Sequence, residues 1–89
     1  MAEEVHRLGD LNEGAGAIIS TSQGSVYANG KLVSVDTSPV SAHIEHPPTI
    51  TANGSSTVFA EGKPINRKGD ADVCGHPRSS GSPNVFAGG

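Results

Sequence analysis

A short motif occurs three times in this chain, and its repetition constrains the fold more than any other feature. The motif reads Val, an aromatic residue, Ala, any residue, then Gly, and its copies begin at Val26, Val58 and Val85. In the first two copies a pair, Asn29-Gly30 or Glu61-Gly62, separates the motif from a second short run, which is typical of a tight β-hairpin. The sequence therefore predicts a threefold pseudo-repeat of short β-hairpins.

The composition supports an all-β fold built from short strands. The chain contains 12 Gly and 6 Pro residues, and no window shows apolar residues at the helical period, so no helix is expected. We expect a single domain over residues 1–89 with no extension domain. The predicted strands cover residues 5–8, 17–20, 25–28, 31–35, 49–52, 57–60, 63–67 and 84–87, with irregular segments at 9–16, 36–48 and 71–80.

The chain is poor in core-forming residues for its size. Only 34% of its 89 residues are hydrophobic, and there are three aromatic side chains. A small domain with a thin core usually needs a disulfide, a metal or a partner subunit to hold it. Cys74 is the only cysteine, so an internal disulfide is excluded and a metal or an assembly partner is expected.

Two pairs of candidate metal ligands lie in two of the irregular segments. His43 and His46 belong to the first pair, and Cys74 and His76 to the second. Imidazole and thiolate are ligands that zinc prefers in closed four-coordinate sites, so these four residues are the expected set, with iron as the alternative metal. An ion shared by the two segments would staple them together. The competing interpretation is that they are ordinary loop histidines and a lone thiol, and His6 is expected at the surface.

Charge and hydropathy exclude some partners. The net charge is −3 with six Lys and Arg residues that form no basic stripe, so a nucleic-acid partner is not expected. The first residues are acidic and no apolar run follows them, so we expect a protein made without a secretory signal peptide.

Two alternative functions use the same residues. In a small metal-dependent or cysteine hydrolase, Cys74 would be the nucleophile, His76 or His46 its base, and Asp70 or Asp72 would orient that base. Cys and His two residues apart in a turn align poorly for proton transfer, and the chain is small for a substrate cleft, so no catalytic residue is expected. A free-standing zinc-stapled adaptor is the other alternative.

Three segments of the chain resemble the PAAR-repeat proteins. Arg7-Leu8-Gly9-Asp10 is similar to the opening strand and Gly-Asp turn of that family. Pro64-Ile65-Asn66-Arg67 stands where the Pro-Ala-Ala-Arg tetrapeptide falls, although Ile65 and Asn66 replace the two Ala residues. Residues 81–88, Gly-Ser-Pro-Asn-Val-Phe-Ala-Gly, resemble the closing motif almost letter for letter. The segment from His43 to His46 lies over a Cys-Pro-x-His segment found in many members, with His in the place of Cys.

The resemblance implies a fold and a function. It implies a small cone with pseudo-threefold symmetry, stapled by a metal near the apex, where the chain ends also gather. Such a monomer would cap the trimeric β-helical spike of a contractile injection machine, one tip per trimer, and sharpen it for piercing a target envelope. The spike would be a lysozyme-like phage protein or a valine-glycine-repeat secretion protein. The location would be the baseplate of a phage tail, or the bacterial cytoplasm followed by delivery through type VI secretion.

Alternation along the repeated strands predicts which side chains face the spike. The set Val26, Val58 and Val85 and the set Tyr27, Phe59 and Phe86 must point to opposite faces. Val is the better core residue, and the hydroxyl of Tyr needs water or a partner. We therefore expect the Val set in the core and the aromatic set nearer the docking surface.

Overall fold

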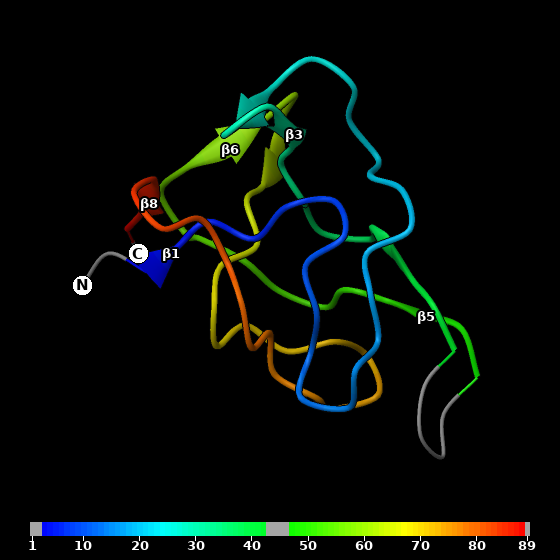
Figure 1. The fold of residues 1–89 in the computed structure, drawn as a ribbon. Helices are drawn as coiled ribbons and strands as arrows, with labels where there is room; N and C mark the ends of the chain where they lie inside the picture. Colours follow the sequence, from blue (N-terminus) through cyan, green and yellow to red (C-terminus); the bar gives the residue numbers. More distant parts are fainter. Residues whose placement is uncertain (1–2, 43–46, 89) are drawn as a thin grey trace.

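The computed structural model describes residues 3–42 and 47–88, and its strands pair in a simple order (Figure 1). This described part contains eight strands of two residues, joined as four antiparallel pairs, and no helix. It therefore contains no helix that could cross a membrane. The predicted all-β class is confirmed. The strands are β1 (Glu3–Glu4), β2 (Tyr27–Ala28), β3 (Lys31–Leu32), β4 (Pro39–Val40), β5 (Thr49–Ile50), β6 (Phe59–Ala60), β7 (Lys63–Pro64) and β8 (Phe86–Ala87).

Three of the four pairs are equivalent, and we call them the hairpin layer: two are hairpins, and the third joins the first and last strands. β2 pairs with β3 and β6 with β7, each through a turn whose two residues have positive φ: 56° and 77° in Asn29-Gly30, and 51° and 79° in Glu61-Gly62. These are the tight turns that the sequence predicted. The third pair joins the ends of the chain, with Glu4 opposite Phe86.

A closed ring of backbone hydrogen bonds joins the three strand pairs of the hairpin layer. The amide of His6 donates to the carbonyl of Asn66 (3.0 Å), that of Asn66 to Ser34 (2.9 Å) and that of Ser34 back to His6 (2.9 Å). All three residues are fully buried. Bridges on either side of the ring pair Val5 with Arg67, Arg7 with Val33, and Val35 with Ile65. The predicted pseudo-threefold arrangement is therefore confirmed, and His6, Ser34 and Asn66 are its central residues.

The core of the hairpin layer corrects the prediction for the repeated Val residues. Val26 and Val85 are 36% and 38% exposed, and Val58 is only partly buried. Because Val and Ala are two residues apart, they share the inner face of each strand, and the Ala residues take its deeper end. Val therefore lies at the rim. The buried cluster consists of Val5, Ala28, Val33, Val35, Ala60, Ile65 and Ala87.

A second set of three loops, residues 11–18, 39–51 and 71–78, forms what we call the loop layer. Their bases are closed by the bridges Leu11–Ala17 and Ala71–Pro77 and by the pair β4–β5. Further bridges join each loop to the next: Asn12 to Arg78, Ile18 to Val40, and Thr51 to Asp72.

Several predicted element boundaries were wrong. The strand β4 lies inside the segment that was expected to be irregular. Residues predicted as strands at 5–8 and 17–20 form isolated bridges, because each contacts a different neighbour in turn.

Related turns connect the two layers. Arg7 and Asp10 form an ion pair at 2.9 Å, and Arg67 and Asp70 do the same at 2.9 Å. In each turn the carboxylate also accepts a hydrogen bond from the backbone amide of the arginine, at 2.8 Å. In the middle repeat the hydroxyl of Ser38 accepts the equivalent hydrogen bond, from the backbone amide of Val35 at 3.1 Å.

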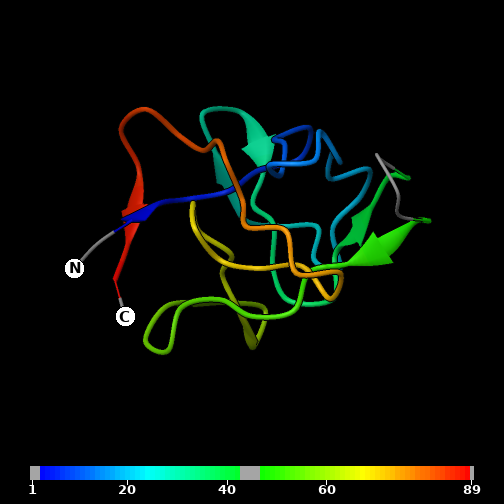
Figure 2. The ribbon, with the colours of Figure 1, turned by 90° about the horizontal axis from the view of Figure 1, so that it is seen from below.

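The chain ends lie in the hairpin layer. β1 and β8 form one of its three strand pairs, on the side of the molecule away from β5 (Figures 1 and 2). The end strands thus complete the threefold ring, in a different layer from Cys74 and His76, whereas the resemblance implied that the chain ends and the metal gather together.

Candidate functional site

Cys74 and His76 lie on one tight loop of the loop layer. The loop is closed by two backbone hydrogen bonds, from the amide of Asp72 to the carbonyl of His76 (3.0 Å) and from the amide of Gly75 to the carbonyl of Asp72 (2.9 Å). Gly75, between the two candidate ligands, has a φ of +95°, which favours glycine. Both candidate ligands are half-buried. The loop thus brings a thiol and an imidazole to the same end of the molecule.

The other two predicted ligands, His43 and His46, lie outside the described residues. Among residues 3–42 and 47–88, no three His, Cys, Asp or Glu side chains gather as a metal site. The strand β5 and the residues that follow it are next to the loop of Cys74. The amide of Val73 donates to the carbonyl of Ile50 (2.9 Å), and that of Ala52 to Ala71 (3.0 Å). The donor types of the four candidate residues, one thiol and three imidazoles, fit zinc.

A cluster of buried polar side chains lies beneath these loops. The guanidinium of Arg78, which is 1% exposed, donates from Nη2 to Oδ2 of Asp72 and contacts Nε2 of His6 through Nη1 at 2.9 Å. The side-chain amide of Asn12 donates to the same oxygen of Asp72 at 2.6 Å. We call His6, Asn12, Asp72 and Arg78 the buried polar cluster.

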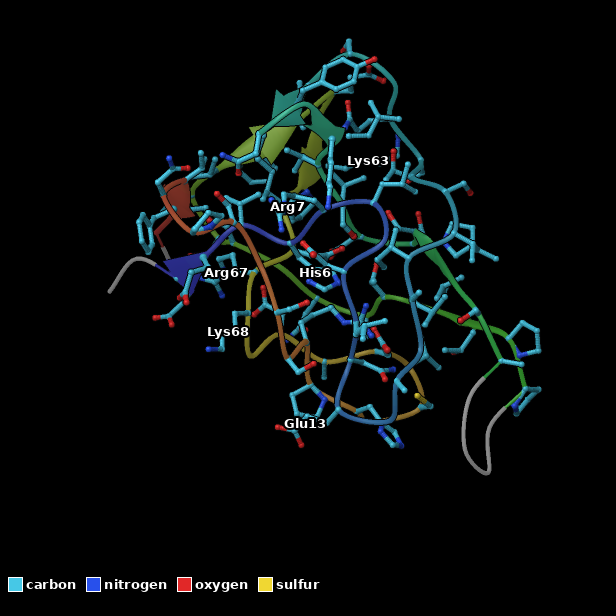
Figure 3. All side chains as sticks on the ribbon, viewed as in Figure 1. His6, Arg7, Glu13, Lys63, Arg67 and Lys68 are labelled. Atoms are coloured by element: carbon cyan, nitrogen blue, oxygen red, sulfur yellow. The ribbon has the colours of Figure 1, made fainter. Side chains whose placement is uncertain are left out.

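His6 lies between the two layers, near the centre of the molecule in Figure 3, and its expected place at the surface is wrong. Its ring is held as a neutral tautomer. Nδ1 faces the carbonyl of Ser80 at 2.8 Å and must donate, whereas Nε2 faces the guanidinium of Arg78 and must accept. Burial lowers the pKa of His6 to about 4, with the charge of Arg78 acting in the same direction.

The buried ion pair is not fully satisfied. Oδ1 of Asp72 and Nε of Arg78 are buried without a hydrogen-bond partner among residues 3–42 and 47–88. Burial lowers the pKa of the Arg78 guanidinium, and the negative charge of Asp72 opposes that effect. Such atoms are costly to bury, so the pair requires an explanation.

This cluster was not predicted from the sequence, although the sequence contains a signal for it. Arg78 follows Asp70 by eight residues, as Ile18 follows Asp10. Aligning the two Gly-Asp turns therefore places Arg78 where the first repeat has a buried apolar residue.

The acidic residues considered for a hydrolase are engaged elsewhere. The carboxylate of Asp70 binds Arg67, and that of Asp72 binds Arg78 in the interior. Both acids therefore neutralise arginines.

The three aromatic residues are exposed at equivalent positions of the hairpin layer. Tyr27 is 59% exposed, and Phe59 and Phe86 are each 53% exposed. Their outward orientation agrees with the alternation in the sequence. Large apolar side chains repeated on one layer are typical of an interaction surface.

Three equivalent strand pairs with outward aromatic residues, next to a layer of three loops, define a small pseudo-threefold β protein. The sequence matches the PAAR motif family over residues 8–77, and the chain belongs to this family. Its members are structural proteins with a spike-tip role in contractile injection systems, in phage tails or type VI secretion, where they sit on spike proteins. A search among curated proteins finds no match.

Proposed function

We propose that this protein caps the end of a trimeric β-helical spike through its hairpin layer, with the loop layer pointing toward the target envelope. The observation that supports this most directly is the set of three exposed aromatic residues, one on each strand pair of the hairpin layer. A pseudo-threefold monomer presents three similar contacts to the three chains of a trimer. One tip would therefore bind one spike, which is either the lysozyme-like spike of a phage or the valine-glycine-repeat spike of a secretion system.

The docking face is tested by removing two of the aromatic side chains. Changing Phe59 and Phe86 to Ser should weaken binding to the trimeric spike protein of the same system by about 100-fold or more, because central aromatic contacts dominate interfaces. Thermal unfolding of the isolated tip should change little, since both rings are exposed. Calorimetry and thermal melting measure the two effects.

A matched control uses exposed apolar residues outside the hairpin layer. Ile19 directly follows the first loop and Val73 lies in the third, and they are 57% and 63% exposed, so changing both to Ser removes similar apolar surface and leaves the hairpin layer intact. This control should bind the spike as the unmodified protein does. If the control loses binding and the aromatic double variant keeps it, the orientation is reversed.

We also propose that a structural zinc ion, or iron, staples the loop layer. Cys74 and His76 would supply two ligands, and His43 and His46 the other two. A structural metal contributes its binding energy to folding, so Cys74→Ser or chelation should lower the melting temperature markedly. Elemental analysis of the purified protein should find about one metal ion per chain. An unchanged melting curve after proven metal removal would rule out the staple.

The mechanical role follows from this arrangement. When the sheath contracts, the spike is driven forward and the loop layer meets the envelope first. The protein would be found in a phage tail baseplate, or in the bacterial cytoplasm before delivery by type VI secretion. Expression of the tip with its spike, followed by imaging of the complex, would show which layer faces outward.

A further inference from the structure

The buried ion pair of Asp72 and Arg78 occurs in only one of three equivalent places. The bridge that joins neighbouring loops pairs Asn12 with Arg78, Val40 with Ile18, and Asp72 with Thr51. The last residues of the three loops occupy equivalent positions. They are Ile18, Thr51 and Arg78, and all are at most 2% exposed. Their amides donate to the carbonyls of Asp10, Ser38 and Asp70 in the same way.

This pseudo-symmetry serves as an internal control for what the fold requires. An apolar side chain fills the position in the first loop and a small hydroxyl residue fills it in the second, so the architecture does not need a charge there. Replacing a buried ion pair by well-packed apolar groups is often neutral or stabilising. In the third loop two buried polar atoms, Oδ1 of Asp72 and Nε of Arg78, even lack a partner within the described part of the chain. Packing alone therefore does not explain the pair.

The pair is attached to the loop that contains Cys74 and His76. The backbone of Asp72 closes this loop at both hydrogen bonds, through its amide to His76 and through its carbonyl from Gly75. The side chain of Asp72 is fixed in turn by Arg78 and Asn12, and Arg78 is fixed by His6 in the central ring. A rigid chain of contacts thus runs from the hairpin layer to the base of this loop.

We propose that Asp72 and Arg78 are positioning residues, which hold the loop of Cys74 and His76 in its ligand-presenting conformation before any metal binds. This inference rests on the proposed metal site. Groups that orient the ligands of a metal raise its affinity by restricting the site to the bound geometry. The first loop, residues 11–18, contains neither Cys nor His, and it contains no such ion pair.

Two variants of the full chain copy the other loops. Asp72→Asn with Arg78→Ile reproduces the residues Asn12 and Ile18, and Asp72→Val with Arg78→Thr reproduces Val40 and Thr51. Both should fold without metal, as measured by circular dichroism. Amide exchange at Gly75 in the metal-free protein should become about 10-fold faster or more, because loops that lose their anchor open more often. Zinc affinity, measured by competition with a chelator, should fall about 10- to 100-fold.

The control variant is Ile18→Val, a small change in the same layer beneath a loop without these ligands. It should leave both the exchange of Gly75 and the zinc affinity unchanged. If the two copied variants keep the exchange rate of Gly75, or bind zinc within about 2-fold of the unmodified protein, which is well below the effect expected of a ligand support, the proposal is wrong. If both variants fail to fold, the pair is structural and the proposal is also wrong.

The two proposals are separated by the unmodified protein. If it binds no zinc, the metal site fails as a proposed function, and the exchange of Gly75 alone decides whether the pair positions the loop. If it binds zinc and the variants bind equally well, only the positioning role fails.

Discussion

The hairpin layer and the loop layer share one threefold plan, but different kinds of side chain fill them. The hairpin layer buries Val, Ile and Ala residues in one cluster. The loop layer is held mainly by polar groups, with Asn12, Asp72 and Arg78 bound to one another and Thr51 bound to the carbonyl of Val35. The same backbone geometry can thus be stabilised by apolar burial at one level and by directed hydrogen bonds at the next.

The difference indicates a division of labour between the layers. Apolar burial is non-directional and tolerates the exchange of one side chain for another of similar volume. It therefore suits a layer that only has to hold three strand pairs together. Hydrogen bonds and ion pairs fix orientation more strictly, so they suit a layer that has to hold short loops in one conformation. If this is correct, the two layers should respond to different perturbations.

The largest effect is expected from a cavity in the hairpin layer. Ile65 is 6% exposed and belongs to the apolar cluster, so Ile65→Ala should lower the free energy of unfolding by about 2–5 kcal/mol. Urea unfolding measures this loss. The control Ile19→Ala removes the same atoms from a side chain that is 57% exposed and should cost less than about 0.5 kcal/mol. Equal losses for both variants would contradict an apolar hairpin core.

A pH titration tests the junction between the layers. The pKa of His6 is about 4 in the folded protein and 6.5 when unperturbed, so the unfolded chain binds the proton more readily between these values. The free energy of unfolding should therefore fall as the pH falls from 6.5 to 4, by up to about 3 kcal/mol from this residue, and the contribution is fully present above pH 6.5.

The matched variant for this titration is His6→Asn, which copies Asn66 at the equivalent ring position. Its stability should depend less on pH across the same window, as measured by urea unfolding at several pH values. A slope equal to that of the unmodified protein would show that His6 is not the group responsible.

A smaller effect is expected where backbone segments of the hairpin layer approach closely. A Cβ added to Gly54 would lie 2.5 Å from the carbonyl oxygen of Ile65, and one added to Gly81 would lie 2.9 Å from that of Val5. Because backbone cannot move aside easily, Gly54→Ala and Gly81→Ala should each cost about 1–3 kcal/mol. Gly24→Ala, which meets no atom within 4 Å, is the control and should change the melting temperature least.

The smallest effect concerns a turn between the layers. Thr37 has a φ of +70°, whereas Gly9 and Gly69 supply positive φ in the related turns. A β-branched residue is strained in this region, so Thr37→Gly should raise the free energy of unfolding by up to about 1 kcal/mol. A decrease in stability would mean that the hydroxyl of Thr37, which donates to the carbonyl of Asp36, outweighs the strain.

The hairpins could be predicted from the sequence because their signals are local. Asn29-Gly30 and Glu61-Gly62 specify their turns by backbone preference alone. The pairing of Glu4 with Phe86 could not be predicted in this way, because nothing near either residue indicates a partner at the other end of the chain. The Val prediction was wrong for a related reason, since alternation gives the face of a strand but not the depth of each residue beneath it.

The candidate site was predictable to a smaller extent. Cys74 and His76 were singled out by residue type, and the structure places them on one loop. His6 and Arg78 were not recognised as buried, because polar residues usually lie at the surface and their burial here depends on contacts between residues 72 positions apart.

The pairing of β1 with β8 has a consequence for how the protein is made. Glu3 can meet Ala87 only after residue 87 has left the ribosome, so the ring cannot close until both hairpins have been synthesised. Until then the two hairpins expose their unpaired edges and the apolar cluster to solvent, which favours aggregation. Contacts this distant along a chain also slow folding. The ring should therefore close late, and its folding should depend more on chaperones than its small size suggests.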